Sequence, residues 1–159
     1  MPVVSLRPLT ELELDEYLSS SKDNFTNEKV RAEGVTVEEA RVAFDRSISA
    51  ALPLGLRSEN QFLFRLRDAH TDERVGLLWF AVKTQGPRRF VWIYDIVIDE
   101  AVRGRGYGEA AMSALEREAA NRGASSIDLH VFGHNTGARR LYEKMGYRPT
   151  NLTMRKDLA

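Results

Sequence analysis

The stretch from Asp95 to Ala111 reads Asp-Ile-Val-Ile-Asp-Glu-Ala-Val-Arg-Gly-Arg-Gly-Tyr-Gly-Glu-Ala-Ala, and it decides how the chain is organised. The β-branched residues Ile96, Val97 and Ile98 predict a buried strand, and the run that begins at Tyr107 predicts a helix. A glycine-rich loop connects the two. Strand, glycine loop and helix in this order form a typical layout for binding an anion.

The glycine loop has the residue types that a phosphorylated ligand requires. Gly104, Gly106 and Gly108 lack Cβ atoms, so the backbone can turn sharply and point consecutive N–H groups at one ligand. The positive end of the helix dipole adds to these donors. Arg103 and Arg105 place cations beside them, which favours a phosphorylated ligand over a plain carboxylate.

Three interpretations of the glycine loop agree poorly with its sequence. A nucleotide-hydrolase P-loop needs a lysine followed by a hydroxyl residue after the glycines, and the chain has neither there. Gly106, Gly108 and Ala111 do fit the Gly-x-Gly-x-x-Ala of a Rossmann fold, but that fingerprint normally opens its fold and here most of the chain precedes it. A turn without a ligand does not explain why two arginines alternate with the glycines.

The loop resembles a known motif. Arg103-Gly104-Arg105-Gly106-Tyr107-Gly108 is similar to the Gln/Arg-x-x-Gly-x-Gly/Ala pyrophosphate loop of the GNAT N-acetyltransferase superfamily. A second segment, Leu129 to Tyr147, resembles the strand, the Asn-x-x-Ala-x-x-Leu-Tyr helix and the Gly-aromatic exit of the same family. Either motif alone is permissive, whereas both in this order are specific. The resemblance covers the chain from about Phe90 onward, and the first half matches only in its order of elements.

The resemblance implies acetyl-CoA as the cosubstrate. Its pyrophosphate would lie on the loop from Arg103 to Gly108, Tyr107 included. The peptide groups of Ile96 and Ile98 would bind the pantetheine arm and would also stabilise the oxyanion that forms when an amine attacks the thioester. Asn135 is predicted to cap the last helix, and it is also a candidate to contact the pantetheine arm.

Tyr142 matches the position of the family's general acid, because a thiolate leaving group needs a proton and a phenol with a pKa of about 10 can supply it. The alternative is a core aromatic beside Leu141. Asp95 is the candidate general base on the face opposite Ile96 and Ile98, or a residue that only balances an arginine or caps a bulge. His130 and a water chain are the other candidates for the base. We expect no metal site, since His130 and His134 are too few and too irregularly placed.

Composition limits the remaining possibilities. The chain has 159 residues, which predicts one domain spanning residues 1–159. It contains no cysteine, which excludes disulfides and a cysteine-linked acyl intermediate. Lys plus Arg and Asp plus Glu number 23 each, so no overall charge favours nucleic acid or an anionic membrane as partners. Because Met1 to Ser5 lacks a signal pattern and the apolar run Leu77–Val82 is too short to span a bilayer, we expect a cytoplasmic location.

Hydrophobic periodicity and caps predict the order of elements. Two capping boxes, at Thr10 and Thr36, start helices, and the polar segment Asn24–Gly34 between them is compatible with either. The predicted strands are Val3–Leu6, Phe62–Arg67, Val75–Lys83, Phe90–Ile98, Ile127–Phe132 and Leu152–Arg155, and the later helices are Tyr107–Arg122 and Asn135–Met145. The resulting fold class is α/β (α+β), a GNAT-like mixed, mostly antiparallel sheet with a splayed parallel strand pair and helices on both faces.

The sequence therefore predicts an acetyl-CoA-dependent N-acetyltransferase that transfers acetyl directly, in a ternary complex, to the amine of a small molecule or a peptide. The competing hypothesis is a non-catalytic module that binds CoA or a nucleotide as a sensor, and Tyr142 disfavours it. No pattern identifies the acceptor amine. The oligomeric state is left open, with a homodimer as one option.

Overall fold

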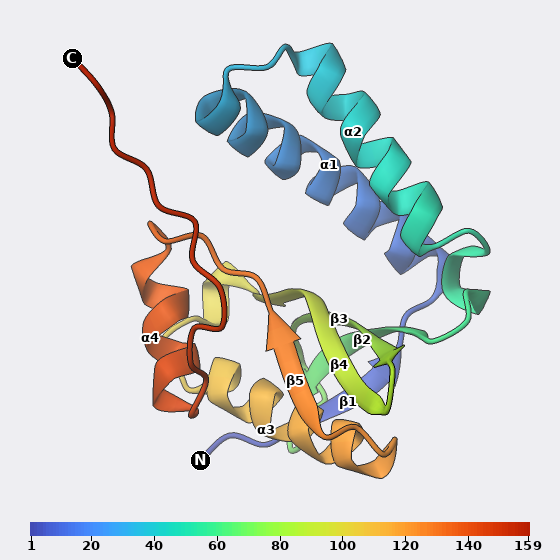
Figure 1. Cartoon of the computed structure of the whole chain (residues 1–159). Helices are drawn as coiled ribbons and strands as arrows, with labels where there is room; N and C mark the ends of the chain where they lie inside the picture. The colour runs from blue at the N-terminus through green and yellow to red at the C-terminus, as the bar shows by residue number, and fades with distance from the viewer. The chain divides into compact units, whose positions relative to one another are not determined.

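Five strands form one sheet in the order β1-β2-β3-β4-β5 in the computed structural model, which describes residues 1–159 (Figure 1). Neighbouring strands are antiparallel except for the last pair, because the chain crosses over through a helix between β4 and β5. The strands are β1 (Val4–Pro8), β2 (Gln61–Asp68), β3 (Arg74–Gln85), β4 (Arg88–Ile98) and β5 (Ser126–Leu129). This arrangement confirms the predicted mixed sheet and its parallel pair.

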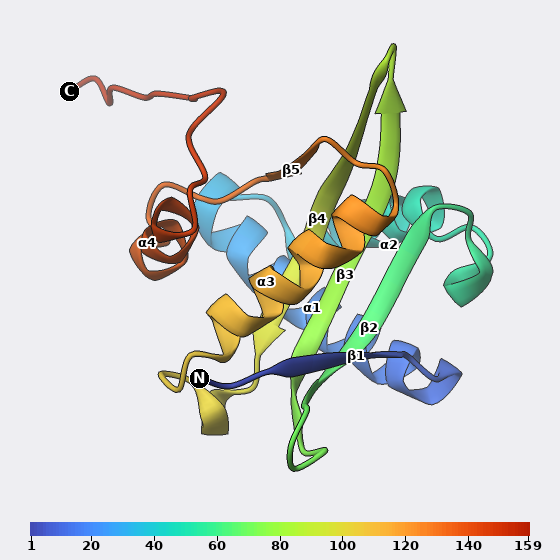
Figure 2. The same ribbon diagram turned by 90° about the horizontal axis from the view of Figure 1, so that it is seen from below.

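The helices are α1 (Glu11–Glu33), α2 (Val37–Ala51), α3 (Tyr107–Asn121) and α4 (Thr136–Lys144), with short 3-10 turns at Gly55–Arg57 and Glu100–Val102. The chain divides into two compact units, Met1–Leu129 and His130–Ala159. Within the first unit, α1 and α2 cover one face of the sheet and α3 covers the other, as predicted (Figures 1 and 2). None of these helices is long and apolar enough to cross a membrane.

Both predicted capping boxes are present. The hydroxyl of Thr10 accepts from the Glu13 amide at 3.2 Å while the Glu13 carboxylate accepts from the Thr10 amide, and Thr36 repeats the pattern with Glu39. The polar segment from Asn24 onward belongs to α1, which ends at Glu33 and is capped by Gly34 with a φ of 69°. The serines Ser19, Ser20 and Ser21 lie inside α1, and each costs a helix only a few tenths of a kcal/mol, so they do not end it.

Two strand predictions at the C-terminal end are wrong. β5 ends at Leu129 and does not reach Phe132, and Leu152–Arg155 is not a strand. The apolar side chains of that last segment are almost fully exposed, 76% for Leu152 and 88% for Met154. Strand propensity expresses how well a side chain packs on a pleated surface, and this segment buries nothing that would hold it in a sheet.

Each face of the sheet in the first unit carries its own core. The face under α3 holds the deeply buried side chains of Leu66, Leu78, Phe80 and Val91, and α3 itself contributes Met112 and Leu115. The face under α1 and α2 holds a second cluster of Leu9, Leu14, Leu52, Leu63, Leu77 and Trp79. Leu9 and Leu14, which flank the N-cap Thr10 as a hydrophobic staple, both belong to this second cluster.

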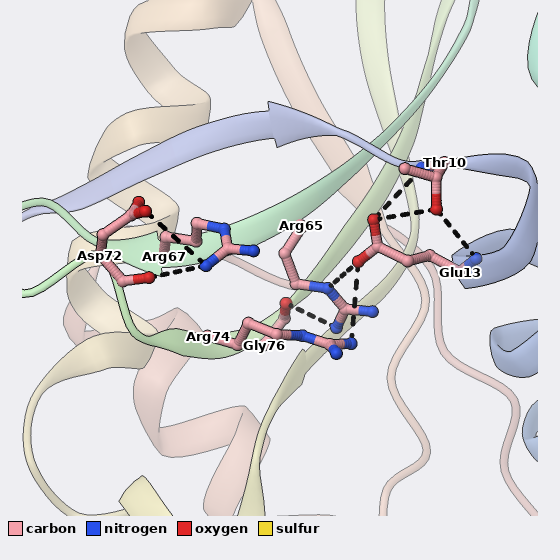
Figure 3. A network of polar contacts seen from close by, with 7 residues as sticks. All are labelled: Thr10, Glu13, Arg65, Arg67, Asp72, Arg74 and Gly76. Carbon is pink, nitrogen blue, oxygen red and sulfur yellow. Dashed lines mark hydrogen bonds and ion pairs between the residues drawn. The ribbon is translucent and has the colours of Figure 1, made fainter.

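A buried ion pair ties the start of α1 to the sheet. Arg65 is charged and alternates with the apolar Phe64 and Leu66 along its strand, yet only 8% of it is exposed. Its Nε donates to the Glu13 carboxylate at 2.8 Å and its Nη1 donates to the Gly76 carbonyl at 3.2 Å (Figure 3). Arg74 lies 3.7 Å from the same carboxylate. Burial raises the pKa of Glu13, but the hydrogen bonds from Arg65 and Thr10 outweigh it, so the pKa is lowered overall.

Replacing Glu13 with Gln should therefore lower the free energy of unfolding by about 3 kcal/mol, the lower end of the range for breaking a buried ion pair. Because Gln can still form the capping box, the loss of stability measures the contribution of the negative charge that pairs with Arg65. Glu39→Gln is the matched control, because it makes the same change in the exposed capping box of α2 and should cost less than about 0.5 kcal/mol. Urea denaturation measures both, and equal losses would contradict this role of Glu13.

Candidate active site

β4 is irregular immediately before the candidate base Asp95. Trp79 of β3 pairs with Asp95, whereas the next residue, Phe80, pairs with Ile93, so Tyr94 is an extra residue in the ladder. Such a β-bulge re-aims the side chains beside it. The ring of Tyr94 stacks on Trp79, with centroids 4.4 Å apart and an interplanar angle of 18°. Tyr94 and Asp95 consequently share the face that α1 and α2 cover.

Asp95 lies in a largely buried setting with a neutral partner. The hydroxyl of Tyr17, on α1, donates to its Oδ2 at 2.6 Å. Burial raises the pKa of the Asp95 carboxyl, and the hydrogen bonds from Tyr17 and from the Ile96 amide oppose part of that rise. Burial and then the charge of Asp95 also raise the pKa of Tyr17, so the phenol stays protonated as the donor. A carboxyl whose pKa is raised in this way accepts a proton more readily than an exposed aspartate does, which suits a general base.

The residues on either side of Val97 present their peptide groups to the edge of β4 that faces away from β3. The Asp99 amide donates to the Val75 carbonyl of β3 at 2.8 Å, and the Val97 carbonyl lies against Gly76 of the same strand. Because alternate residues of a strand point to opposite edges, Ile96 and Ile98 point outward. The parallel ladder with β5 ends at Ile93 and Leu129. The outward peptide groups therefore lie beyond the part of β4 that β5 pairs.

The glycine loop leads directly into α3. Gly104 and Gly106 have φ values of 76° and 88°, which glycine adopts without strain, and Gly106 is the N-cap of a helix that starts at Tyr107 as predicted. No side chain caps this helix. The amides of Tyr107 and Gly108 lie in its first turn, where backbone donors have no acceptor within the helix. Their orientation and the helix dipole make this loop suited to an anion.

Two side chains of the loop have structural contacts that the sequence does not reveal. Arg103 donates from Nε to the Ile98 carbonyl at 3.0 Å, and the Tyr107 hydroxyl donates to Asp68 at 2.6 Å. The hydrogen bond from Tyr107, with those from the Thr71 and His70 amides, lowers the pKa of Asp68 to about 2. Tyr107 thus fixes the loop to the end of β2, and what it can offer a phosphate is its backbone amide.

The second unit contains the other candidate residues. Asn135 caps α4 as predicted, with its Oδ1 accepting from the Ala138 amide at 3.2 Å. Tyr142 is half-buried in α4, and its ring packs against Tyr147 with centroids 5.7 Å apart. His130 is exposed and lies edge-to-face with Phe132. The structure contains no group of three or more His, Cys, Asp or Glu side chains that could hold a metal ion.

Tyr17 is the site residue that the sequence did not identify. Its contact with Asp95 joins residues 78 positions apart, which no local pattern indicates. Its one local signal is its position one helical turn after Glu13, the residue that ties α1 to the sheet.

Comparison with known proteins identifies relatives over nearly the whole chain. The model of the Acetyltransferase (GNAT) family matches residues 16–147. The uncharacterized N-acetyltransferases YycN and YdgE of Bacillus subtilis (strain 168) are each 33% identical over 155 residues, which is 98% of this chain and 99% and 98% of theirs. The crystal structure of YycN superposes with a TM-score of 0.88 and covers 99% of both chains. A protein from Pyrococcus furiosus, 22% identical, shares the fold with a TM-score of 0.72 over 99% of this chain and all of its own.

Proposed function

The chain belongs to the GNAT acetyltransferase family, and on this premise we propose that it is an acetyl-CoA-dependent N-acetyltransferase acting on the amine of a small molecule or a protein. The observation that carries the proposal is the glycine loop at the start of α3, which follows the outward-facing part of β4 in the chain. We also propose that residues 1–159 act as one domain, since a single family model spans both units.

The residues present fit the parts of acetyl-CoA. The backbone amides from Arg103 to Gly108, with the exposed Arg105 beside them, suit the pyrophosphate. The outward peptide groups of Ile96 and Ile98 suit the amides of the pantetheine arm. To bind the arm, the Ile98 carbonyl gives up the hydrogen bond that it accepts from Arg103. Asn135 is proposed to contact the same arm in addition to capping α4.

The proposed reaction is direct transfer. Asp95 takes a proton from the acceptor ammonium, the freed amine forms a bond to the acetyl carbon, the carbon–sulfur bond breaks, and the new amide nitrogen loses its second proton to water. Tyr142 gives its proton to the departing sulfur. The chain has no cysteine to carry an acetyl group, which supports direct transfer with both substrates bound together, and initial-velocity lines should then intersect.

The proposal is tested by ligand binding and by turnover. Acetyl-CoA should raise the melting temperature in proportion to RT ln(1 + [L]/Kd), and NAD at the same concentration should not. Release of free CoA thiol should then depend on an added amine. Stabilisation by acetyl-CoA without amine-dependent thiol release would favour a non-catalytic sensor, and stabilisation by NAD alone would favour a dinucleotide-binding protein.

Replacing Gly106 with Val should abolish the shift in melting temperature that acetyl-CoA produces. A β-branched side chain resists the φ of 88°, and its Cβ would lie 3.3 Å from Pro2 at the loop where the pyrophosphate is proposed to bind. Gly34→Val is the matched control, because Gly34 has a φ of 69° with nothing within 4 Å of an added Cβ. Both variants should lose about 1–2 kcal/mol of stability from the left-handed conformation, but only Gly34→Val should still respond to acetyl-CoA. A normal response from Gly106→Val would place the pyrophosphate elsewhere.

A further inference from the structure

An aromatic surface lies beside Asp95 on the face of the sheet that α1 and α2 cover. We define it as Trp79, Trp92 and Tyr94. Trp79 is buried and stacks on Tyr94, which is 36% exposed, and the edge of Tyr17 meets Trp79 with centroids 6.4 Å apart. Because Tyr17 also donates to Asp95, the rings of Tyr94, Trp79 and Tyr17 and the carboxylate form one continuous set of contacts.

A cation of the protein itself rests on this surface. The ammonium of Lys83 lies 5.5 Å from the centroid of Trp92 and 5.3 Å from that of Tyr94. Both distances are within the range in which a cation is attracted by the face of an aromatic ring. Lys83 is exposed and forms no ion pair, so these rings are its partners. An exposed contact of this kind is weak, and another ammonium can displace it.

The charges around the surface favour a cationic ligand. Asp128 lies opposite Trp92 in the parallel ladder, but its carboxylate is 2.7 Å from Arg88 and is therefore compensated. Asp95 has no cationic partner, since its contact is the neutral hydroxyl of Tyr17. The surface thus combines the partly exposed rings of Trp92 and Tyr94 with one carboxylate that lacks a counter-ion, and these are the groups that recognise alkylammonium ions.

We propose that the aromatic surface binds a second, non-reacting ammonium of the acceptor, so that the preferred acceptor is a diamine. The reacting nitrogen faces Asp95, while the distal ammonium replaces Lys83 on the faces of Trp92 and Tyr94. Lys83 occupies this place when no acceptor is bound. This inference rests on the proposed N-acetyltransferase function.

The test compares cadaverine with pentylamine, which has the same chain but a single amine. Tyr94→Leu and Trp92→Leu should each lower kcat/KM for cadaverine by about five- to thirtyfold more than for pentylamine, as expected for losing one cation–π contact of about 1–2 kcal/mol. Lys83→Met should lower the KM for cadaverine about two- to fivefold, because it removes the competing cation. Lys29→Met is the matched control and should not change the preference, since Lys29 lies over Phe25 at 5.8 Å and pairs with Glu33.

The possible failures are distinguishable. If the ring variants lose the same factor with both amines, the diamine proposal is wrong and the acetyltransferase assignment stands. Calorimetric binding of cadaverine to the wild-type protein and to Tyr94→Leu gives a second readout that does not need turnover. Binding that the variant loses, in a protein that transfers acetyl to no amine, would uphold the ammonium site and overturn the function. Absence of binding together with absence of turnover would overturn both.

Discussion

Replacing Tyr142 with Phe should lower kcat by about 10²- to 10⁴-fold and leave acetyl-CoA binding nearly intact. The variant keeps the ring that packs against Tyr147 and removes the hydroxyl that is proposed to protonate the departing sulfur. Without that proton the leaving group is a thiolate, which is a stronger nucleophile toward the acetyl carbon than a thiol. Thiol release under saturating substrates measures kcat, and the acetyl-CoA-induced shift in melting temperature measures binding.

Tyr147→Phe is the control for this prediction, because it removes a hydroxyl from the neighbouring ring of the same unit. Its kcat should stay within about threefold of the wild-type value, since the general acid is retained. A loss of less than tenfold in Tyr142→Phe would mean that water protonates the sulfur, and Tyr142 would then be a packing residue of α4.

Asp95→Asn should lower kcat/KM by about 10²- to 10⁴-fold and remove the acidic limb of the pH profile. A general base works only when it is deprotonated, so activity falls as the pH drops through its pKa. Burial raises the pKa of Asp95, which places this limb at higher pH than an exposed aspartate would. Rates measured across the acidic range in wild type and variant test the assignment.

Tyr17→Phe provides the matched comparison, because it leaves the carboxyl in place and removes its donor. The hydrogen bond from Tyr17 lowers the pKa of Asp95, so its loss should move the acidic limb to higher pH without abolishing it. An acidic limb that is unchanged in Asp95→Asn would transfer the base role to His130 or to a chain of waters.

Local signals in the sequence predicted much of the fold. The capping boxes at Thr10 and Thr36, the start of α3 at Tyr107 and the cap of α4 at Asn135 each depend on residues within one helical turn, and all are confirmed. The parallel pairing of β4 with β5 followed from the helix between them. The strand predicted at Leu152–Arg155 is absent because its alternating apolar side chains have no core to pack against.

The contacts that build the candidate site were harder to predict, because they join residues far apart in the chain. Arg65 looked like a solvent-facing residue, and only the partner on α1 explains its burial. The bulge does have a signal in the sequence, which is the spacing of the apolar residues of β4. The buried face of β4 uses Val91 and Ile93, then Ile96 and Ile98, so the interval of two residues is broken once at the extra residue.

The extra residue Tyr94 affects the course of β4 and its pairing with neighbouring strands. A strand with Tyr94 deleted would alternate without interruption, and every side chain on either side of the deletion would keep its present face. The bulge is therefore not needed to place each side chain of β4 on its present face of the sheet. Its effect is on the path of the strand, because a bulge bends and twists its strand and interrupts the ladder locally. A chain one residue shorter here would present the same carboxylate to the same helices, yet its straighter edge would favour continued pairing beyond Ile93 and would occupy the peptide groups that we propose bind the pantetheine arm.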